Sequence, residues 1–242
     1  MKLTFKDLDY LFKGANTNNH IFMFHGYGAN KNDLYPLAEY LDPSSNWNWY
    51  FINAPLKLEM GMMEARAWFP LDEKRFMLSP DQRQSDLQNN YPKELDDLKI
   101  IIYEFIKNKL SEFKQNGHNS AQGKIALGGF SQGSMIVSHL APELVKFPIF
   151  NYNLTHLLIY SGALLGYEKL MSAFEKLENS KSQTPIINFL QSHGSEDTLL
   201  PEQSAKKLFE LLNQYFQGTF ISFRGWHEIP LNVLQESKKL LS

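Results

Sequence analysis

Short apolar runs, each bounded by glycine, proline or polar residues, recur along the chain and predict the strands of a sheet. Most of these runs are continuous and not alternating, which is typical of strands covered on both faces of a parallel sheet. The predicted strands are Ile21–Phe24, Trp49–Asn53, Lys124–Phe130, Thr155–Tyr160, Ile186–Gln191 and Thr219–Phe223. We therefore expect a mostly parallel sheet between two layers of helices.

Segments with apolar residues at helical spacing lie between those strands. The longest is Pro92–Phe113, where apolar residues recur three or four positions apart. Asn30 and Asp33 resemble a capping pair that opens a helix through Leu41. The other predicted helices are Gln132–Leu140, Glu202–Phe216 and Leu231–Leu241. Strand and helix alternate without a repeat or a break in composition, which predicts one doubly wound α/β domain over residues 1–242.

The least regular stretch of the sequence is 54–91. Methionine and aromatic residues, Met62 and Trp68 among them, stand there between charged residues. A connection of this length inside a compact domain is often functional, as a lid or as the wall of a groove. The same residue types are also ordinary core material, so the sequence leaves both interpretations open. We expect short helical turns within it.

The composition narrows the class of protein. The 242 residues are 43% hydrophobic and 21% charged, as in ordinary globular proteins. A net charge of -2 with scattered lysine and arginine argues against nucleic acid as a partner. The absence of cysteine excludes disulfides, thiolate metal sites and a cysteine nucleophile. Without the apolar core of a signal peptide or a run long enough to span a bilayer, we expect cytoplasmic localisation and no integral membrane association.

The segment GFSQG, Gly129–Gly133, directly follows a predicted strand and precedes a predicted helix. This is the nucleophile-elbow pattern, in which a sharp turn exposes the serine hydroxyl, here that of Ser131. Alone, the pattern fits equally well a glycine-rich turn whose serine merely caps the helix. Two phosphate-binding interpretations fail, because Ser134 stands where a P-loop needs lysine and Lys31 where a dinucleotide fingerprint needs its third glycine.

A serine hydroxyl becomes a good nucleophile only when a base takes its proton and an acid orients that base. Asp197 lies in HGSED after the strand Ile186–Gln191, and His227 lies in HEIP after the strand Thr219–Phe223. The order Ser, Asp, His along the chain is that of the α/β-hydrolases. Glu196 stands next to Asp197 and remains an alternative acid.

A hydrolase of this kind also needs two backbone amides that receive the negative charge on the substrate carbonyl oxygen. HGYGAN, His25–Asn30, directly follows the first predicted strand, and we expect the amides of Tyr27 and Gln132 to be these donors. His25 and His193 stand beside the motifs, and we expect both to have structural hydrogen-bonding roles. The histidines without metal-ligand spacing are His20, His118, His139 and His156.

Together these motifs resemble the carboxylesterase/phospholipase family of α/β-hydrolases, which includes acyl-protein thioesterases and lysophospholipases. The matching segments are HGYGAN, NAP, AWF, GGFSQG, SGAL, HGSED and HEIP, and they span about Ile21 to Leu241. The resemblance implies an α/β-hydrolase fold with Ser131 as nucleophile, Asp197 as orienting acid and His227 as general base. It also implies that no cofactor or metal is needed and that acyl esters or thioesters are the substrates.

Some positions depart from the family pattern. Ser134 replaces the glycine that usually extends the elbow, and Trp226 precedes the base where glycine is common. Segments 71–91 and 142–155 are longer than usual, which leaves the acyl groove undefined. The candidate substrate-binding residues are Trp68, Met62 and Leu164. We expect a small-molecule or lipid acyl ester, or a lipidated protein, as partner. The sequence does not define the oligomeric state, and the resemblance makes a homodimer worth testing. The alternative functions are an amidase or peptidase with the same triad and a non-catalytic ligand-binding protein of the same fold.

Overall fold

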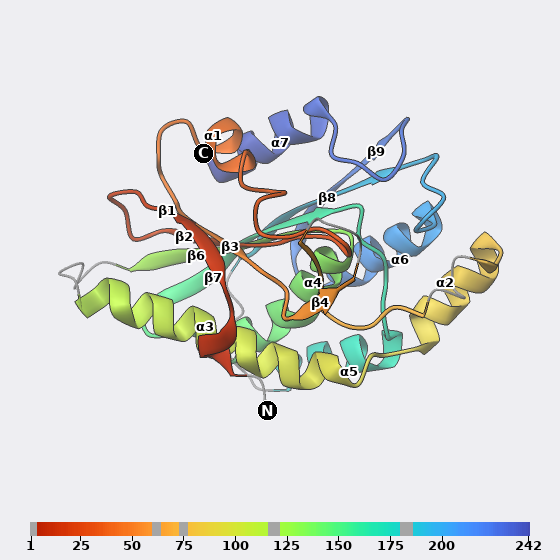
Figure 1. Ribbon diagram of the computed structural model, residues 1–242, viewed down its shortest axis with the longest axis horizontal. Coiled ribbons are helices and arrows are strands. Elements are labelled where there is room, and N and C mark those ends of the chain that lie inside the picture. Colours follow the sequence, from red (N-terminus) through yellow and green to blue (C-terminus); the bar gives the residue numbers. More distant parts are fainter. Residues whose placement is uncertain (1–3, 60–63, 73–76, 116–121, 180–185) are drawn as a thin grey trace.

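A central sheet organises the structure, a computed structural model that describes residues 4–59, 64–72, 77–115, 122–179 and 186–242 (Figure 1). Within these residues, seven strands pair in the order β1-β3-β2-β6-β7-β8-β9. Their bounds are Tyr10–Lys13 (β1), His20–Phe24 (β2), Asn48–Ile52 (β3), Gly123–Phe130 (β6), Tyr152–Tyr160 (β7), Asn188–Gly194 (β8) and Gln217–Phe223 (β9). Strands β2 to β9 of this sheet are parallel and β1 is antiparallel to β3. The predicted mostly parallel sheet is confirmed.

Helices cover both faces of the sheet (Figure 1). The helices are α1 (Leu37–Leu41), α2 (Pro80–Asn89), α3 (Glu94–Gln115), α4 (Gln132–Lys146), α5 (Tyr167–Glu178), α6 (Glu202–Leu212) and α7 (Leu231–Leu241). On β2, Ile21 and Met23 pack in a cluster with α1 and α7, whereas Phe22 and Phe24 belong to a second cluster with α3, α4, α5 and α6. Burial on both faces explains why the strand sequences are continuously apolar. Among the described helices, none is long and apolar enough to cross a membrane.

The expected helix from Asn30 to Leu41 is wrong over its first half. Only Leu37–Leu41 is helical, because the Asn30 side chain is used in a local turn. Its Oδ1 accepts from the Asn32 amide at 3.0 Å and its Nδ2 donates to the Glu64 carbonyl at 2.8 Å. Asparagine competes with helix formation through such local bonds.

Several elements were not predicted. They are β1, the hairpin of β4 (Leu56–Leu58) and β5 (Ala65–Ala67), and the helices α2 and α5. Helix α4 also continues beyond its predicted end, to Lys146. The stretch 54–91 therefore contains more regular structure than the short turns expected there.

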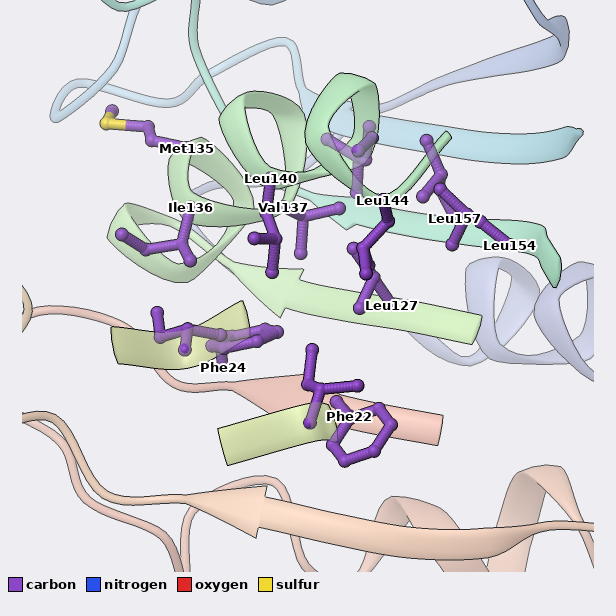
Figure 2. Close-up of a cluster of buried hydrophobic side chains, with 14 of the residues drawn as sticks. Phe22, Phe24, Leu127, Met135, Ile136, Val137, Leu140, Leu144, Leu154 and Leu157 are labelled. Atoms are coloured by element: carbon purple, nitrogen blue, oxygen red, sulfur yellow. The ribbon is translucent and has the colours of Figure 1, made fainter. Parts of the chain in front are cut away.

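Helix α4 is almost wholly buried, and its first residue directly follows Ser131. Its apolar side chains, Ile136, Val137, Leu140 and Leu144, lie against the side chains of β2, β6 and β7 (Figure 2). Burying each such side chain contributes roughly 1.5 to 3 kcal/mol. The turn between β6 and α4 is thus held between two firmly packed elements.

Candidate active site

The motifs HGYGAN and GFSQG lie next to each other, beyond the carboxyl ends of β2 and β6. Strands β2 and β6 are parallel neighbours, with Phe24 opposite Gly129 in their register. From β2 the chain goes to β3 on one side, and from β6 it continues to β7 on the other. This reversal is a topological switch point, where open α/β sheets bind ligands beyond the carboxyl ends of their strands.

The turn that carries Ser131 requires both of its glycines. Ser131 has φ 54° and ψ -116°, a conformation that serine rarely adopts. A Cβ atom on Gly133 would lie 1.9 Å from the Phe24 carbonyl oxygen, and one on Gly129 would lie 2.4 Å from the Gly133 backbone. The chain can therefore turn this sharply only because residues 129 and 133 lack side chains, as in a nucleophile elbow.

Ser134, which departs from the family pattern, fits the elbow without loss of hydrogen bonding. Its side chain is buried, and its Oγ lies 2.6 Å from the Gly129 carbonyl oxygen and 2.8 Å from that of Tyr160. A Cβ atom on Gly162 would lie 2.6 Å from the Ser134 Cβ. Glycine at position 162 thus leaves the space that the serine occupies.

Asp197 and His227 are in direct contact. His227 Nδ1 lies 2.6 Å from Asp197 Oδ2, and the amides of Leu199 and Leu200 donate to Asp197 Oδ1 at 2.8 and 3.0 Å. The Asp197 side chain is fully enclosed. Burial opposes its ionisation, but hydrogen bonds from His193 and His227 outweigh burial and hold the pKa of Asp197 far below its usual range. Asp197 is therefore a carboxylate.

The oxygen atoms that face His193 and His227 determine which ring nitrogens carry protons. His193 Nε2 lies 2.8 Å from the Leu200 carbonyl oxygen and 3.1 Å from Asp197 Oδ2, so this nitrogen carries a proton. His227 Nδ1 also faces the carboxylate and carries a proton for the same reason. The Nε2 atom of neutral His227 is then an acceptor, as a general base requires.

The loops that carry Asp197 and His227 are packed against each other. A Cβ atom on Gly194 would lie 2.1 Å from the Trp226 carbonyl oxygen, so the two loops touch through their backbones. Glu196 turns outward, and its carboxylate pairs with Arg224 Nε at 3.0 Å. The acid in contact with the imidazole is consequently Asp197, and the alternative acid is directed elsewhere.

Ser161 in the SGAL motif links the loop that carries His227 to β7. Its Oγ donates to the Glu228 carbonyl at 3.1 Å, one residue after His227. The His227 ring lies 4.8 Å from the ring of Phe130, which precedes Ser131. The loop after β9 thus extends across β7 to the end of β6.

His25 fixes the direction of the backbone in HGYGAN. Its Nε2 accepts from the Ala54 amide at 3.0 Å, so the proton is on Nδ1, which lies 2.8 Å from the Gly26 carbonyl oxygen. In a planar trans peptide the C=O and N–H bonds point in opposite directions. The His25 hydrogen bond therefore also orients the amide of Tyr27.

The hairpin β4–β5 and the two residues that follow it are hydrogen-bonded to the HGYGAN loop and to Gln132. The Gly28 amide donates to the Arg66 carbonyl at 2.9 Å. Gln132 Oε1 accepts from the Trp68 amide, and its Nε2 donates to the Phe69 carbonyl, both at 2.8 Å. The Gln132 side chain is thus occupied by structural bonds. In the described part of the chain, the backbone amides of Tyr27 and Gln132 have no hydrogen-bond acceptor.

Ser131 and His227 line one cavity of about 210 Å³ at this edge of the sheet. Among the described residues no hydrogen bond joins the Ser131 hydroxyl to the imidazole, a looseness common in ligand-free sites. The other residues that line the cavity are Gly26, Tyr27, Ala29, Asp33, Phe69, Leu71, Arg83, Leu87, Phe130, Gln132, Met135, Leu199 and Leu200. Most of this wall is apolar.

Two of the three candidate substrate-binding residues lie elsewhere. Trp68 and Leu164 are buried in the core and are not among the residues that line the cavity. The Trp68 indole instead donates to the His25 carbonyl at 2.8 Å. Met62, the third candidate, lies outside the described residues. The apolar wall comes instead from Phe69, Leu71 and Leu87, together with Met135, Leu199 and Leu200.

Arg83 attaches helix α2 to the loop that follows Asp197. Its Nη1 donates to the carbonyls of Thr198 and Leu199, the latter at 2.9 Å, and its Nη2 donates to the Leu78 carbonyl at 3.0 Å. Leu199 and Arg83 both line the cavity. Helix α2 is therefore a fixed wall of the site in this structure.

The remaining histidines are structural in their placement. His20 is buried among aromatic rings, including that of Tyr50, and His118 lies outside the described residues. Burial lowers the pKa of His139 and of His156 to about 4, and it has the same effect on His25. Among the described residues, no group of three or more histidine and acidic side chains is placed to hold a metal ion.

We expect the free energy of unfolding to decrease between about pH 6.5 and about pH 4. His25 and His139 have pKa values of about 4 in the folded chain, whereas the unfolded chain takes up these protons near pH 6.5. The stabilisation from each neutral histidine is therefore fully present above pH 6.5. As the pH falls below 6.5, the free energy of unfolding decreases by at most about 1.4 kcal/mol per pH unit for each histidine. Urea denaturation at several pH values measures this slope. His139→Gln should reduce it, and an unchanged slope in that variant would contradict the assignment.

The model of the phospholipase/carboxylesterase family matches residues 12–242. The chain belongs to this family. As a phospholipase/carboxylesterase family member it is a hydrolase, and its α/β-hydrolase fold was correctly predicted. No match was found among curated proteins.

Solved structures share the fold of this phospholipase/carboxylesterase family member. Esterase PE8 is 20% identical with a TM-score of 0.70, and the match covers 97% of both chains. The Zea mays acyl-protein thioesterase 2 is 21% identical with a TM-score of 0.68, covering 97% of this chain and 99% of the other. The Bacillus cereus carboxylesterase is 16% identical with a TM-score of 0.64, covering 97% and 93%. At these identities the likeness establishes the fold.

Proposed function

We propose that the protein is a serine hydrolase that cleaves carboxylic esters or thioesters of acyl groups through an acyl-enzyme. Ser131 is the nucleophile, His227 the general base and Asp197 the acid that orients it. The observation that carries the proposal is the 2.6 Å contact between His227 and Asp197 beside the cavity that Ser131 also lines. Among related structures, an esterase, a carboxylesterase and an acyl-protein thioesterase have the same fold.

The reaction follows from these positions. His227 Nε2 takes the proton of Ser131 Oγ while that oxygen forms a bond to the substrate carbonyl carbon. The amides of Tyr27 and Gln132 receive the charge that develops on the carbonyl oxygen. Collapse of this intermediate breaks the bond to the alcohol or thiol, which leaves with the proton from His227. Water then attacks the acyl-enzyme by the same route and releases the carboxylic acid.

The apolar wall supports an acyl group as the part of the substrate that is enclosed. Phe69, Leu71 and Leu87, all in the stretch 54–91, line one part of it, so this stretch serves as a groove wall in the proposed enzyme. The cavity of about 210 Å³ is smaller than the roughly 300 to 1,000 Å³ of pockets that enclose drug-sized ligands. We infer that short acyl groups fit it best.

Labelling with a fluorophosphonate tests the proposal directly. The reagent forms a covalent bond only with an activated serine, and we expect stoichiometric modification at Ser131 by peptide mass spectrometry, accompanied by loss of p-nitrophenyl butyrate hydrolysis. Ser131→Ala should not be labelled. Hydrolysis that persists after complete labelling would reject the proposed nucleophile. A comparison of butyrate esters with butyramides separates an esterase from an amidase.

A further inference from the structure

One carboxylate stands unpaired on the wall of the same cavity. Asp33 follows HGYGAN in the chain and lines the cavity together with Ser131 and His227. Its backbone amide donates to the Asn30 carbonyl at 3.1 Å. Among the described residues, its side chain forms no hydrogen bond and no ion pair, and it is exposed to solvent. This carboxylate is thus available to a ligand.

The cations near Asp33 are committed to other groups. Lys31 pairs with Asp9, and Arg66 pairs with Glu64. Arg83, which also lines the cavity, donates to the backbone carbonyls of Leu199 and Leu78. Partial burial at the cavity raises the pKa of Asp33, and no neighbouring charge offsets this effect. A positive charge brought by a ligand would therefore meet an uncompensated carboxylate.

The position of Asp33 in the fold separates it from the apolar wall. Along the chain, Asp33 lies between HGYGAN and α1, whereas Leu87 belongs to α2. Helices α1 and α2 lie far apart on different sides of α4 (Figure 1). An acyl group on the α2 side would leave the other half of an ester toward α1. In that binding mode the leaving alcohol lies on the same side of the cavity as Asp33.

We propose that Asp33 selects esters whose leaving alcohol carries an ammonium or quaternary ammonium group. The inference rests on the proposed function of Ser131. The rings of Tyr27 and Phe130 line the same cavity, and aromatic faces attract quaternary ammonium groups. Attraction between the carboxylate and the cation favours the cationic ester over a neutral ester of the same shape, and salt weakens this preference.

A matched pair of substrates tests the proposal. Butyrylcholine and 3,3-dimethylbutyl butyrate have the same acyl group and leaving alcohols of the same shape, but only the first carries a charge. We expect wild-type protein to show a kcat/KM about three- to tenfold higher for butyrylcholine at low ionic strength. Asp33→Asn should abolish this preference by lowering kcat/KM for butyrylcholine much more than for the neutral ester.

The matched control is Asp97→Asn, which removes an exposed carboxylate from α3. It should retain the wild-type preference. Equal rates for the two esters in wild-type protein, or a preference that persists in Asp33→Asn, would overturn the inference while hydrolysis of the neutral ester still supports the proposed function. If wild-type protein hydrolysed neither ester, the proposed function and the inference about Asp33 would both be rejected.

The cation has two chemical sources, a small amino-alcohol ester and a lipid headgroup. Lysophosphatidylcholine and lysophosphatidylglycerol provide the corresponding lipid pair. A preference for choline that Asp33→Asn abolishes in the lipid pair identifies the headgroup as a source, and one confined to the butyrate pair identifies the small ester. Both results support the inference, whereas insensitivity to Asp33→Asn in both pairs overturns it.

Discussion

Replacement of Ser131 by alanine should lower kcat for p-nitrophenyl butyrate by about 10⁴- to 10⁶-fold. The proposed reaction forms its covalent bond at Ser131 Oγ, and no other hydroxyl occupies that point of the turn. The fold should be preserved, because the Ser131 side chain makes no hydrogen bond among the described residues and alanine adopts the same backbone conformation at a similar cost. Steady-state kinetics and thermal unfolding measure both effects.

Ser138→Ala is the control for this substitution. Ser138 is a buried serine of α4, the helix that follows the elbow, and its Oγ donates to the Met135 carbonyl at 2.9 Å. Its removal should change kcat by only a few fold. Titration of active sites with the fluorophosphonate excludes contamination by wild-type protein. Comparable kinetics for Ser131→Ala and Ser138→Ala would be incompatible with the proposed nucleophile.

The four loops of the site could be located from sequence because parallel strands end at one edge of the sheet. Once the strands ending at Phe24, Phe130, Gln191 and Phe223 are placed in one parallel sheet, the residues that follow them lie at the same edge. The need for glycine at positions 129 and 133 could also be predicted from the sequence. Contacts of 1.9 and 2.4 Å would arise from any Cβ atom at Gly133 or Gly129, so sequence and backbone constrain each other there.

The walls of the cavity could not be located in this way. Arg83 bonds to carbonyls of Thr198 and Leu199, more than a hundred residues along the chain, and a carbonyl acceptor has no signature in sequence. Trp68 was an expected acyl contact by its residue type, yet its indole bonds to a backbone carbonyl beneath the loop. The helix expected from Asn30 failed because a side-chain turn competes with a cap, and both use the same residue.

Asp197 makes hydrogen-bonding contacts that the HGSED motif does not predict. Two backbone amides hold one carboxylate oxygen, and two imidazoles, those of His193 and His227, share the other. All four contacts require an acceptor at Asp197. The position therefore tolerates a carboxylate much better than any group that presents a hydrogen-bond donor.

Replacement of Asp197 by asparagine should reduce kcat by about 10³- to 10⁴-fold. The asparagine carbonyl can take the place of Oδ1, where the amides of Leu199 and Leu200 donate. Its NH₂ group then faces His227 Nδ1 and donates to it. The proton of the neutral ring moves to Nε2, which can no longer accept a proton from Ser131. Steady-state kinetics with p-nitrophenyl butyrate measures this loss.

Glu196→Gln provides the matched control, because it makes the same chemical change at the neighbouring residue. Glu196 pairs with exposed Arg224, and an exposed pair of this kind contributes about 0 to 1 kcal/mol to stability. Its loss should leave kcat within a few fold of wild type. If Glu196→Gln lost as much activity as Asp197→Asn, the carboxylate would act through the loop as a whole and not through the tautomer of His227. A loss specific to Asp197→Asn, in protein that remains folded at the assay temperature, ties catalysis to the proton on Nδ1.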